Sequence, residues 1–170
     1  DYYRGIPRLE HLADGAVIAR VVNPSGTVSK IITPRGNIKQ FQYDAMNRLT
    51  TIDFPIGYDV SISWSPNASI LSRGNYREQT TWDEYGRKSS LARTDTGSGK
   101  TYLKNWSYDV FGRKVFESDV NSSVGVRWTY DRLGRVVRTE FQDGSAEHSV
   151  YKGPFEVDHY DENDRLTTLS

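Results

Sequence analysis

Hydrophobic and polar residues alternate along much of the chain. Residues 124–130 have Val, Val, Trp and Tyr at every second position, and residues 60–64 have Val, Ile and Trp in the same arrangement. The positions between them hold Gly, Ser, Thr and Arg. Because the side chains of a strand alternate between its two faces, this period of two puts the large apolar groups on one face. The pattern predicts β-strands rather than helices.

Short segments rich in Pro, Gly, Asn and Asp separate the alternating stretches. Such segments favour chain reversals, because Gly and Asn tolerate a left-handed backbone and Pro fixes φ near the value of a turn. Strands joined by short turns pair antiparallel with their neighbours. The turn segments are Asn23-Pro24-Ser25-Gly26, Pro34-Arg35-Gly36-Asn37, Pro55-Ile56-Gly57, Ser65-Pro66-Asn67, Gly97-Ser98-Gly99 and Asp143-Gly144.

A hexapeptide recurs five times along the chain. Each copy has an aromatic residue, Asp, two variable residues, a small or polar residue, and Arg. An internal repeat of this kind is typical of architectures built by adding one supersecondary unit to the next. The copies are Tyr43-Asp44-Ala45-Met46-Asn47-Arg48, Trp82-Asp83-Glu84-Tyr85-Gly86-Arg87, Tyr108-Asp109-Val110-Phe111-Gly112-Arg113, Tyr130-Asp131-Arg132-Leu133-Gly134-Arg135 and Tyr160-Asp161-Glu162-Asn163-Asp164-Arg165.

The composition of the hexapeptide predicts a hairpin tip. Its fifth position holds only residues that adopt a left-handed backbone at low cost. A type I turn followed by such a residue closes a hairpin with a bulge, and the Asp side chain can accept a hydrogen bond from the amide two residues on. The Arg begins the return strand, where its guanidinium can pair with the turn Asp. The fifth-position residues are Asn47, Gly86, Gly112, Gly134 and Asp164.

The spacing of the copies predicts how many strands separate them. Subtracting positions 44, 83, 109, 131 and 161 gives intervals of 39, 26, 22 and 30 residues. The two shorter intervals match two strands and two turns, and the first has room for an extra hairpin around Pro66. We expect a single hairpin array over residues 21–170. Residues 1–20 form a lead-in, in which residues 9–19 are either a strand pair or a short helical turn.

Charge and composition exclude several partners. The chain has 22 basic and 22 acidic residues, so it lacks the clustered positive charge with which proteins bind nucleic acid. It has no cysteine for a disulfide or a thiolate zinc site. No run of 18 apolar residues is present, and Asp1 has no apolar leader before it, so we expect a soluble chain cut from a longer one.

The repeated Tyr-Asp-x-x-Gly-Arg pattern resembles the YD repeat of Rhs proteins, toxin-complex subunits and teneurins. The resemblance extends over residues 21–170. It implies an all-β fold in which hairpins add edge to edge into a curved, mostly antiparallel sheet, here a partial turn of a hollow shell. The chain departs from the repeat at Trp82 in place of Tyr, at Asn47 and Asp164 in place of Gly, and at Lys88 and Lys114, where Leu or Val is common.

The same resemblance predicts a structural function. We expect a non-catalytic segment of a bacterial secreted or cell-surface shell that encapsulates or carries a toxin or effector domain located elsewhere in the full protein. Its partners would be other YD-repeat segments and that effector, and the isolated fragment could dimerise edge to edge. The alternative is an adhesion module that binds carbohydrate or a cell-surface protein through exposed Trp and Tyr. No segment of the Asp-Pro-x-Gly type, which marks the self-cleaving core of the family, is present.

Other motifs give little support for catalysis, metals or cofactors. Residues 97–101 (Gly-Ser-Gly-Lys-Thr) resemble the end of a phosphate-binding loop, but Thr94 stands where that loop needs Gly, and a strand is expected to follow. Residues 95–98 (Asp-Thr-Gly-Ser) match one loop of an aspartic protease, which leaves a dimeric protease using Asp95 as the third hypothesis. No zinc-binding spacing joins the three histidines, and Arg165 interrupts the acidic residues at 161–164 that could suggest calcium.

Overall fold

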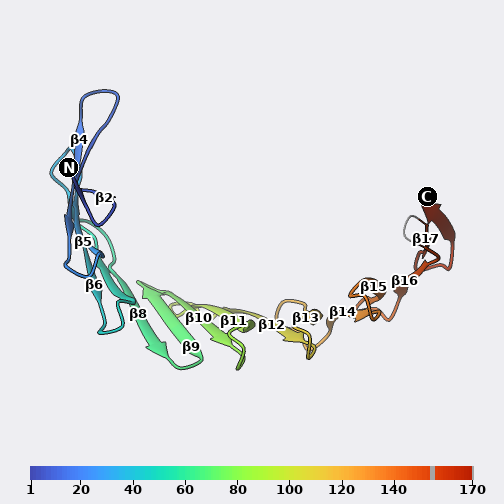
Figure 1. Cartoon of the computed structure of the whole chain (residues 1–170). Coiled ribbons are helices and arrows are strands. Elements are labelled where there is room, and N and C mark those ends of the chain that lie inside the picture. The colour runs from blue at the N-terminus through green and yellow to red at the C-terminus, as the bar shows by residue number, and fades with distance from the viewer. Residues whose placement is uncertain (154–155, 170) are drawn as a thin grey trace. The chain divides into compact units, whose positions relative to one another are not determined.

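The computed structural model describes residues 1–153 and 156–169. All regular structure in these residues is β-strand, which confirms the all-β prediction. Strands β3 to β18 form a 16-stranded antiparallel sheet in which the strand order is the sequence order, and β1 and β2 form a separate pair (Figure 1). Each strand is therefore joined by a turn to its neighbour in the sheet, as the repeat predicts.

The chain divides into two compact units, and each is described by itself. Unit 1 comprises residues 1–79 and 94–99. Short turns join its successive strands, and each strand from β3 to β9 pairs antiparallel with the next. The strands are β1 (Tyr2–Tyr3), β2 (Ile6–Pro7), β3 (Leu9–His11), β4 (Val17–Val22), β5 (Val28–Ile32), β6 (Ile38–Tyr43), β7 (Leu49–Asp53), β8 (Val60–Ser65) and β9 (Ala68–Arg73).

Unit 2 comprises residues 80–93 and 100–170, and its described strands from β12 to β18 pair in sequence order. Strands β10 and β11 have residues in both units. The strands are β10 (Tyr76–Trp82), β11 (Lys88–Asp95), β12 (Thr101–Tyr108), β13 (Lys114–Ser118), β14 (Gly125–Tyr130), β15 (Val136–Glu140), β16 (Ala146–Tyr151), β17 (Val157–Tyr160) and β18 (Leu166–Leu169).

The segment between residues 9 and 19 is a strand pair. Leu9 pairs with Ala19 and His11 with Val17, and a turn at 12–16 joins the two strands. Of the two structures expected for this segment, the helical turn was therefore wrong. The boundary at residue 20 between lead-in and array stays a prediction.

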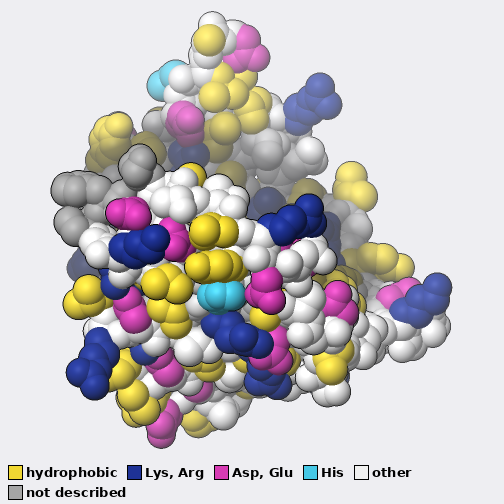
Figure 2. All heavy atoms as spheres, turned by 90° about the vertical axis from the view of Figure 1, so that its right-hand side faces the viewer, with side chains coloured by type: hydrophobic (Ala, Val, Ile, Leu, Met, Phe, Trp, Pro, Cys, Tyr) yellow, Lys and Arg dark blue, Asp and Glu magenta, His cyan; other side chains and the backbone are white. Residues whose placement is uncertain are grey.

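The fold has a thin core. Within residues 1–153 and 156–169, the only buried hydrophobic side chains are Val60 and Leu91, each 7% exposed. The chain exposes 11497 Å² of surface, whereas a compact monomer of this mass exposes about 8,500 Å². Hydrophobic side chains lie among charged and polar ones on the face shown in Figure 2. Much of the apolar surface is half-buried between neighbouring side chains of the same sheet face rather than under a second layer.

The strand count explains the spacing of the repeat. Successive tips among those at 83–87, 109–113 and 131–135 are separated by two strands. These three tips therefore lie at the same end of the strands of unit 2. Three strands, β15 to β17, precede the tip at 161–165. Because the connections of an antiparallel sheet alternate between the two ends of its strands, this fifth copy lies at the opposite end. In unit 1, the extra hairpin expected around Pro66 is present as β8 and β9.

Candidate functional site

All five hexapeptides reverse the chain in the same way. In each copy the Asp amide donates to the Arg carbonyl, and the amide of the fifth residue donates to the Asp carbonyl, at 2.8–3.1 Å. The fifth residue has a left-handed backbone in every copy, with φ between 58° and 83°. Four turns that lack the Asp–Arg pair share these two backbone bonds, so the side chains of the motif are not needed for the backbone shape. These turns are at 12–16, 23–27, 33–37 and 141–145.

The Asp carboxylate and the Arg side chain lock each tip. Asp109 Oδ1 accepts hydrogen bonds from the amides of Phe111 and Arg113, both at 2.9 Å, and its Oδ2 accepts one from Arg113 Nε at 2.6 Å. The same three bonds form in the copies that contain Asp44, Asp83 and Asp131. In the fifth copy Asp161 keeps both amide bonds, and Arg165 Nε lies 3.1 Å from its Oδ2.

These contacts lower the pKa of all five carboxyl groups. For Asp44, Asp131 and Asp161 the largest cause is the hydrogen bond from the backbone amide of the turn Arg. For Asp83 and Asp109 partial burial raises the pKa, but the hydrogen bonds from the turn amides and the Arg side chain outweigh it. Every tip therefore holds an ionised Asp at neutral pH.

The turn Arg also contacts the next hairpin. The Arg113 guanidinium lies over the ring of Tyr130, 4.6 Å from its centroid, and its Nη1 donates to the Asp131 carbonyl at 3.0 Å. Arg87 makes the same contacts with the ring of Tyr108, at 4.7 Å, and with the carbonyl of Asp109, at 3.3 Å. One guanidinium thus joins its own tip to the following tip through a cation–π contact and a charge-assisted hydrogen bond.

The aromatic side chains form a matching series of hydrogen bonds. In each case a ring OH or NH donates to a backbone carbonyl. The acceptor is the first residue after the previous turn at the same end of the strands. Because these carbonyls are at the start of the return strand, each bond fixes one hairpin against the next. In unit 1 the pairs are Tyr43 with Val28 and Trp64 with Leu49, at 2.9 and 2.8 Å. In unit 2 they are Tyr108 with Lys88, Tyr130 with Lys114 and Tyr151 with Val136, at 3.0, 2.7 and 3.2 Å.

Two lysines that depart from the repeat pattern have partners of their own. The ammonium of Lys88 lies 5.8 Å from the ring centroid of Trp106, and that of Lys114 lies 4.6 Å from Trp128. Each lysine follows a turn Arg, and each Trp lies two residues before the Tyr of the next copy. These pairs were not predicted from the sequence, although Arg-Lys followed by Trp-x-Tyr-Asp occurs twice and was the available signal.

The fifth copy is the last hairpin tip in the described residues, so its Arg has no following hairpin there to contact. Arg165 has 76% of its side chain exposed, and no aromatic ring lies against its guanidinium in the described part of the chain. The aromatic residue of this copy, Tyr160, stacks on His148, with ring centroids 4.3 Å apart. The motif thus closes a turn in all five copies, and in the four copies that are followed by another hairpin its Arg lies over an aromatic ring of that hairpin.

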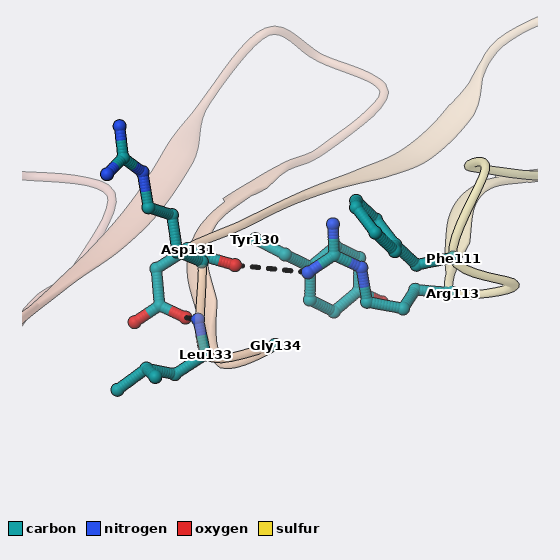
Figure 3. Close-up of a pocket in the computed structure, with 7 residues that line it drawn as sticks. Phe111, Arg113, Tyr130, Asp131, Leu133 and Gly134 are labelled. Carbon is teal, nitrogen blue, oxygen red and sulfur yellow. Dashed lines mark hydrogen bonds between the residues drawn. The ribbon is translucent and has the colours of Figure 1, made fainter.

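A shallow hollow of about 520 Å³ lies between the tips at 109–113 and 131–135. Figure 3 shows Arg113 and Phe111 on one side of it and the 131–135 tip on the other, with the bond from Arg113 to the Asp131 carbonyl between them. Phe111 and Leu133 are 80% and 78% exposed. The carboxylate that lines the hollow, Asp131, accepts its hydrogen bonds from turn amides and Arg135.

The other candidate motifs lie in turns. Asp95 accepts hydrogen bonds from the Gly97 amide and the Ser98 hydroxyl, and these bonds, the hydroxyl first, lower its pKa. The phosphate-loop-like segment at 97–101 leads into strand β12, which begins at Thr101, rather than into a helix, as expected. Within residues 1–153 and 156–169 no group of three His, Asp or Glu side chains is placed to hold a metal ion. No helix in those ranges is long and apolar enough to cross a membrane.

Solved structures with the same fold identify the architecture. A crystal structure of TcdB2-TccC3-Cdc42 matches 89% of this chain with a TM-score of 0.60 and 13% identity, and one of TcdB2-TccC3 matches 95% with 0.59 and 12%. The Tc holotoxin pore of Photorhabdus luminescens matches 92% with 0.62 and 11%. This chain shares its fold with Tc toxin proteins. The toxin-complex resemblance of the repeat is thereby confirmed at the level of the fold.

The matches cover a small part of each solved chain. The aligned regions are 9%, 12% and 10% of those chains, so this chain spans about a tenth of their length. No family model matches the sequence, and no curated protein matches it.

The left-handed fifth position allows a direct test of the turn. We expect Gly134→Val to destabilise the protein by about 1–2 kcal/mol, because a β-branched residue is forced into the left-handed region. A Cβ at Gly134 meets no atom within 4 Å, so the loss reports backbone strain alone. Gly112→Val should show the same effect, with an added contact to the Arg87 guanidinium at 3.4 Å. Thermal unfolding measures both, and unchanged melting temperatures would contradict the turn assignment.

The lowered carboxyl pKa values predict loss of stability in acid. Glu117 contacts the ammonium groups of Lys104 and Lys114, which lower its pKa to about 2 from an unfolded value of 4.5. A carboxyl whose pKa is lower in the folded state stabilises the fold fully above the unfolded pKa and loses this effect as pH falls. We therefore expect Glu117→Gln to lower the melting temperature at pH 6 and to have a much smaller effect at pH 2, where Glu117 is partly protonated in the folded protein as well. Glu84→Gln, at an exposed tip position, is the control and should change neither value.

Proposed function

We propose that this chain is a non-catalytic structural segment of a YD-repeat shell that encloses or carries an effector domain located elsewhere in the full protein. The observation that carries the proposal is the link between hairpins, in which Arg87 and Arg113 each hold the next tip. Such links join each hairpin to the next, so a sheet can grow hairpin by hairpin without a second layer. The fold shared with Tc toxin proteins supports the same function.

The exposure of the sheet also supports a wall. A single antiparallel layer satisfies its backbone hydrogen bonds internally, so it can separate two compartments without reactive groups. The chain exposes more surface than a compact monomer of its mass, which fits a sheet whose faces meet other parts of an assembly. We propose other YD-repeat segments of the same bacterial secreted or cell-surface protein, and the effector, as those partners.

A glycan-binding function has less support. Trp64, Trp106 and Trp128, which would stack on sugar rings, each have a cation over one ring face. Stacking on that face would require the cation to leave. A glycan array with a reproducible ligand, lost in Trp128→Ala, would favour this alternative over the shell.

Protease protection in the native polypeptide tests the shell. We expect a protein segment outside this chain to resist protease in the native polypeptide and to become sensitive in its Arg113→Ala variant, because the wall opens between two tips. The Arg132→Ala variant, at an exposed variable position of the tip that Arg113 contacts, is the matched control and should leave protection unchanged. Equal protease sensitivity of all segments in the native and Arg113→Ala polypeptides would contradict an enclosing wall.

The open edges of the sheet predict association of the isolated chain. In the described residues the end strands β3 and β18 each pair on one side only. Unpaired strand edges tend to pair with another chain, so we propose an edge-to-edge dimer. Light scattering at several protein concentrations measures it, and a monomer at all of them would contradict this proposal without affecting the shell.

A further inference from the structure

Successive hairpins in unit 2 repeat one register. Across the tip at 109–113, Tyr108 pairs with Lys114 and Ser107 with Phe116. Across the tip at 131–135, the residues 22 positions later pair in the same way, Tyr130 with Val136 and Thr129 with Arg138. The bulge also falls at the same place in both hairpins, and the return strands β13 and β15 both have five residues.

The two hairpins also offer the same surface to the hairpin that follows. Arg113 lies over Tyr130, and the Lys114 carbonyl accepts the Tyr130 hydroxyl. Arg135 lies over Tyr151 at 3.9 Å, and the Val136 carbonyl accepts the Tyr151 hydroxyl at 3.2 Å. The docking surface therefore consists of a guanidinium and the next backbone carbonyl. A tyrosine at the end of the approaching strand is the partner that it fits.

This surface does not depend on the side chain after the Arg. Lys114 and Val136 differ in charge and shape, yet both contribute the same carbonyl. The contact of Lys114 with Trp128 joins two residues of one 22-residue segment, residues 114–135. The close approach of Gly125 to Ser118 lies within the same segment. Removing the segment thus removes both members of these pairs together.

We propose that residues 114–135 are an exchangeable module, because the tip that ends at Arg113 can receive the strand that normally docks on the tip ending at Arg135. In a chain that lacks this segment, Arg113 takes the place of Arg135 over Tyr151, and the Val136 carbonyl keeps its bond to the Tyr151 hydroxyl. Strand β12 then pairs with β15 in the register that it has with β13. The sheet is shorter by two strands and otherwise follows the same pairing.

Some contacts are lost in the shortened chain. The Lys104 ammonium loses Glu117, and the Asn105 amide loses the Ser118 hydroxyl. Asn121 no longer bonds to the strand β12 backbone at residues 101 and 103. We therefore expect a lower melting temperature than that of the parent chain, with a single cooperative transition and an all-β circular dichroism spectrum.

A disulfide reports the new register. The chain has no cysteine, and Ser107→Cys with Arg138→Cys places thiols on β12 and β15, which β13 and β14 separate in the parent. In the chain lacking residues 114–135 these positions become direct antiparallel partners, at a Cα separation of about 4.5–5.5 Å that a disulfide spans. We expect oxidation to form the bond in the shortened chain and not in the parent.

A deletion that is one residue shorter is the control. Removing residues 114–134 instead leaves one extra residue after Arg113, which moves every following side chain to the other face of the sheet. This chain should form little disulfide. The proposal is overturned if the 22-residue deletion unfolds the protein, if it folds without the disulfide, or if both deletions form the bond equally.

Discussion

Gly125→Ala is expected to cause the largest loss of stability of any single alanine substitution in strands β13 and β14. A Cβ at this position would lie 2.1 Å from the Glu117 carbonyl oxygen and 2.6 Å from the Ser118 Cα. Both are backbone atoms, so the neighbouring strand has to move. Ser118 is 1% exposed and its hydroxyl accepts a hydrogen bond from the Asn105 amide, so the movement also disturbs strand β12. We expect a loss of about 3 kcal/mol or more.

Thermal unfolding and hydrogen exchange measure this effect. For a chain of this size the melting temperature should fall by about 6–12 °C, and exchange should increase in β13 and β14 first. Gly153→Ala is the matched control, since a Cβ there meets no atom within 4 Å and φ is not in the left-handed region. A Gly125→Ala protein as stable as the control would show that the two strands are not in this close contact.

Arg113→Ala is expected to produce the second-largest effect, because one side chain stabilises two tips. The substitution removes the ion pair with Asp109, the hydrogen bond to the Asp131 carbonyl and the contact with the Tyr130 ring. Hydrogen bonds to charged groups and cation–π contacts of this kind together contribute about 2–3 kcal/mol. The melting temperature should fall by about 4–12 °C.

Arg165→Ala distinguishes the two parts of this effect. Arg165 occupies the same motif position and pairs with Asp161, but its side chain is 76% exposed. An ion pair this exposed contributes little to stability, so this variant should melt close to the parent. Arg113→Lys keeps the charge and loses the planar fork, and it should lie between the two. If Arg113→Ala and Arg165→Ala have equal effects, the contacts between hairpins contribute nothing, and the shell proposal loses its main support.

The five copies of the motif also differ in whether their Arg side chain contacts a second hairpin. The backbone reversal occurs without Asp at the first position and Arg at the last in the turns at 12–16 and 33–37, where Gly supplies the left-handed residue. The Asp–Arg pair is added to this shape, and its further use is to direct the guanidinium at the next hairpin. This contact requires an aromatic side chain of a following hairpin at the same end of the strands, which Arg165 does not have in the described residues.

The strands, the tips and their left-handed residues could all be predicted from the amino-acid sequence. A tip depends on six neighbouring residues, within which the Asp carboxylate can only reach the amides that follow it. For this reason the geometry at Asp109 follows from the hexapeptide. The interval lengths likewise predicted the extra hairpin at Pro66, because strands and turns have limited lengths.

The contacts between hairpins could not be predicted in this way and are known only from the three-dimensional arrangement. Arg113 and Tyr130 are 17 residues apart, and their contact depends on the register of β13 with β14, which alternation alone does not specify. The same applies to the contact of Lys114 with Trp128 and to the position of the 161–165 tip at the opposite end of the strands. A shift of one residue in any strand would reverse the side chains and remove every one of these contacts. Contacts within a turn are fixed by the covalent chain, whereas contacts between turns are fixed by pairing.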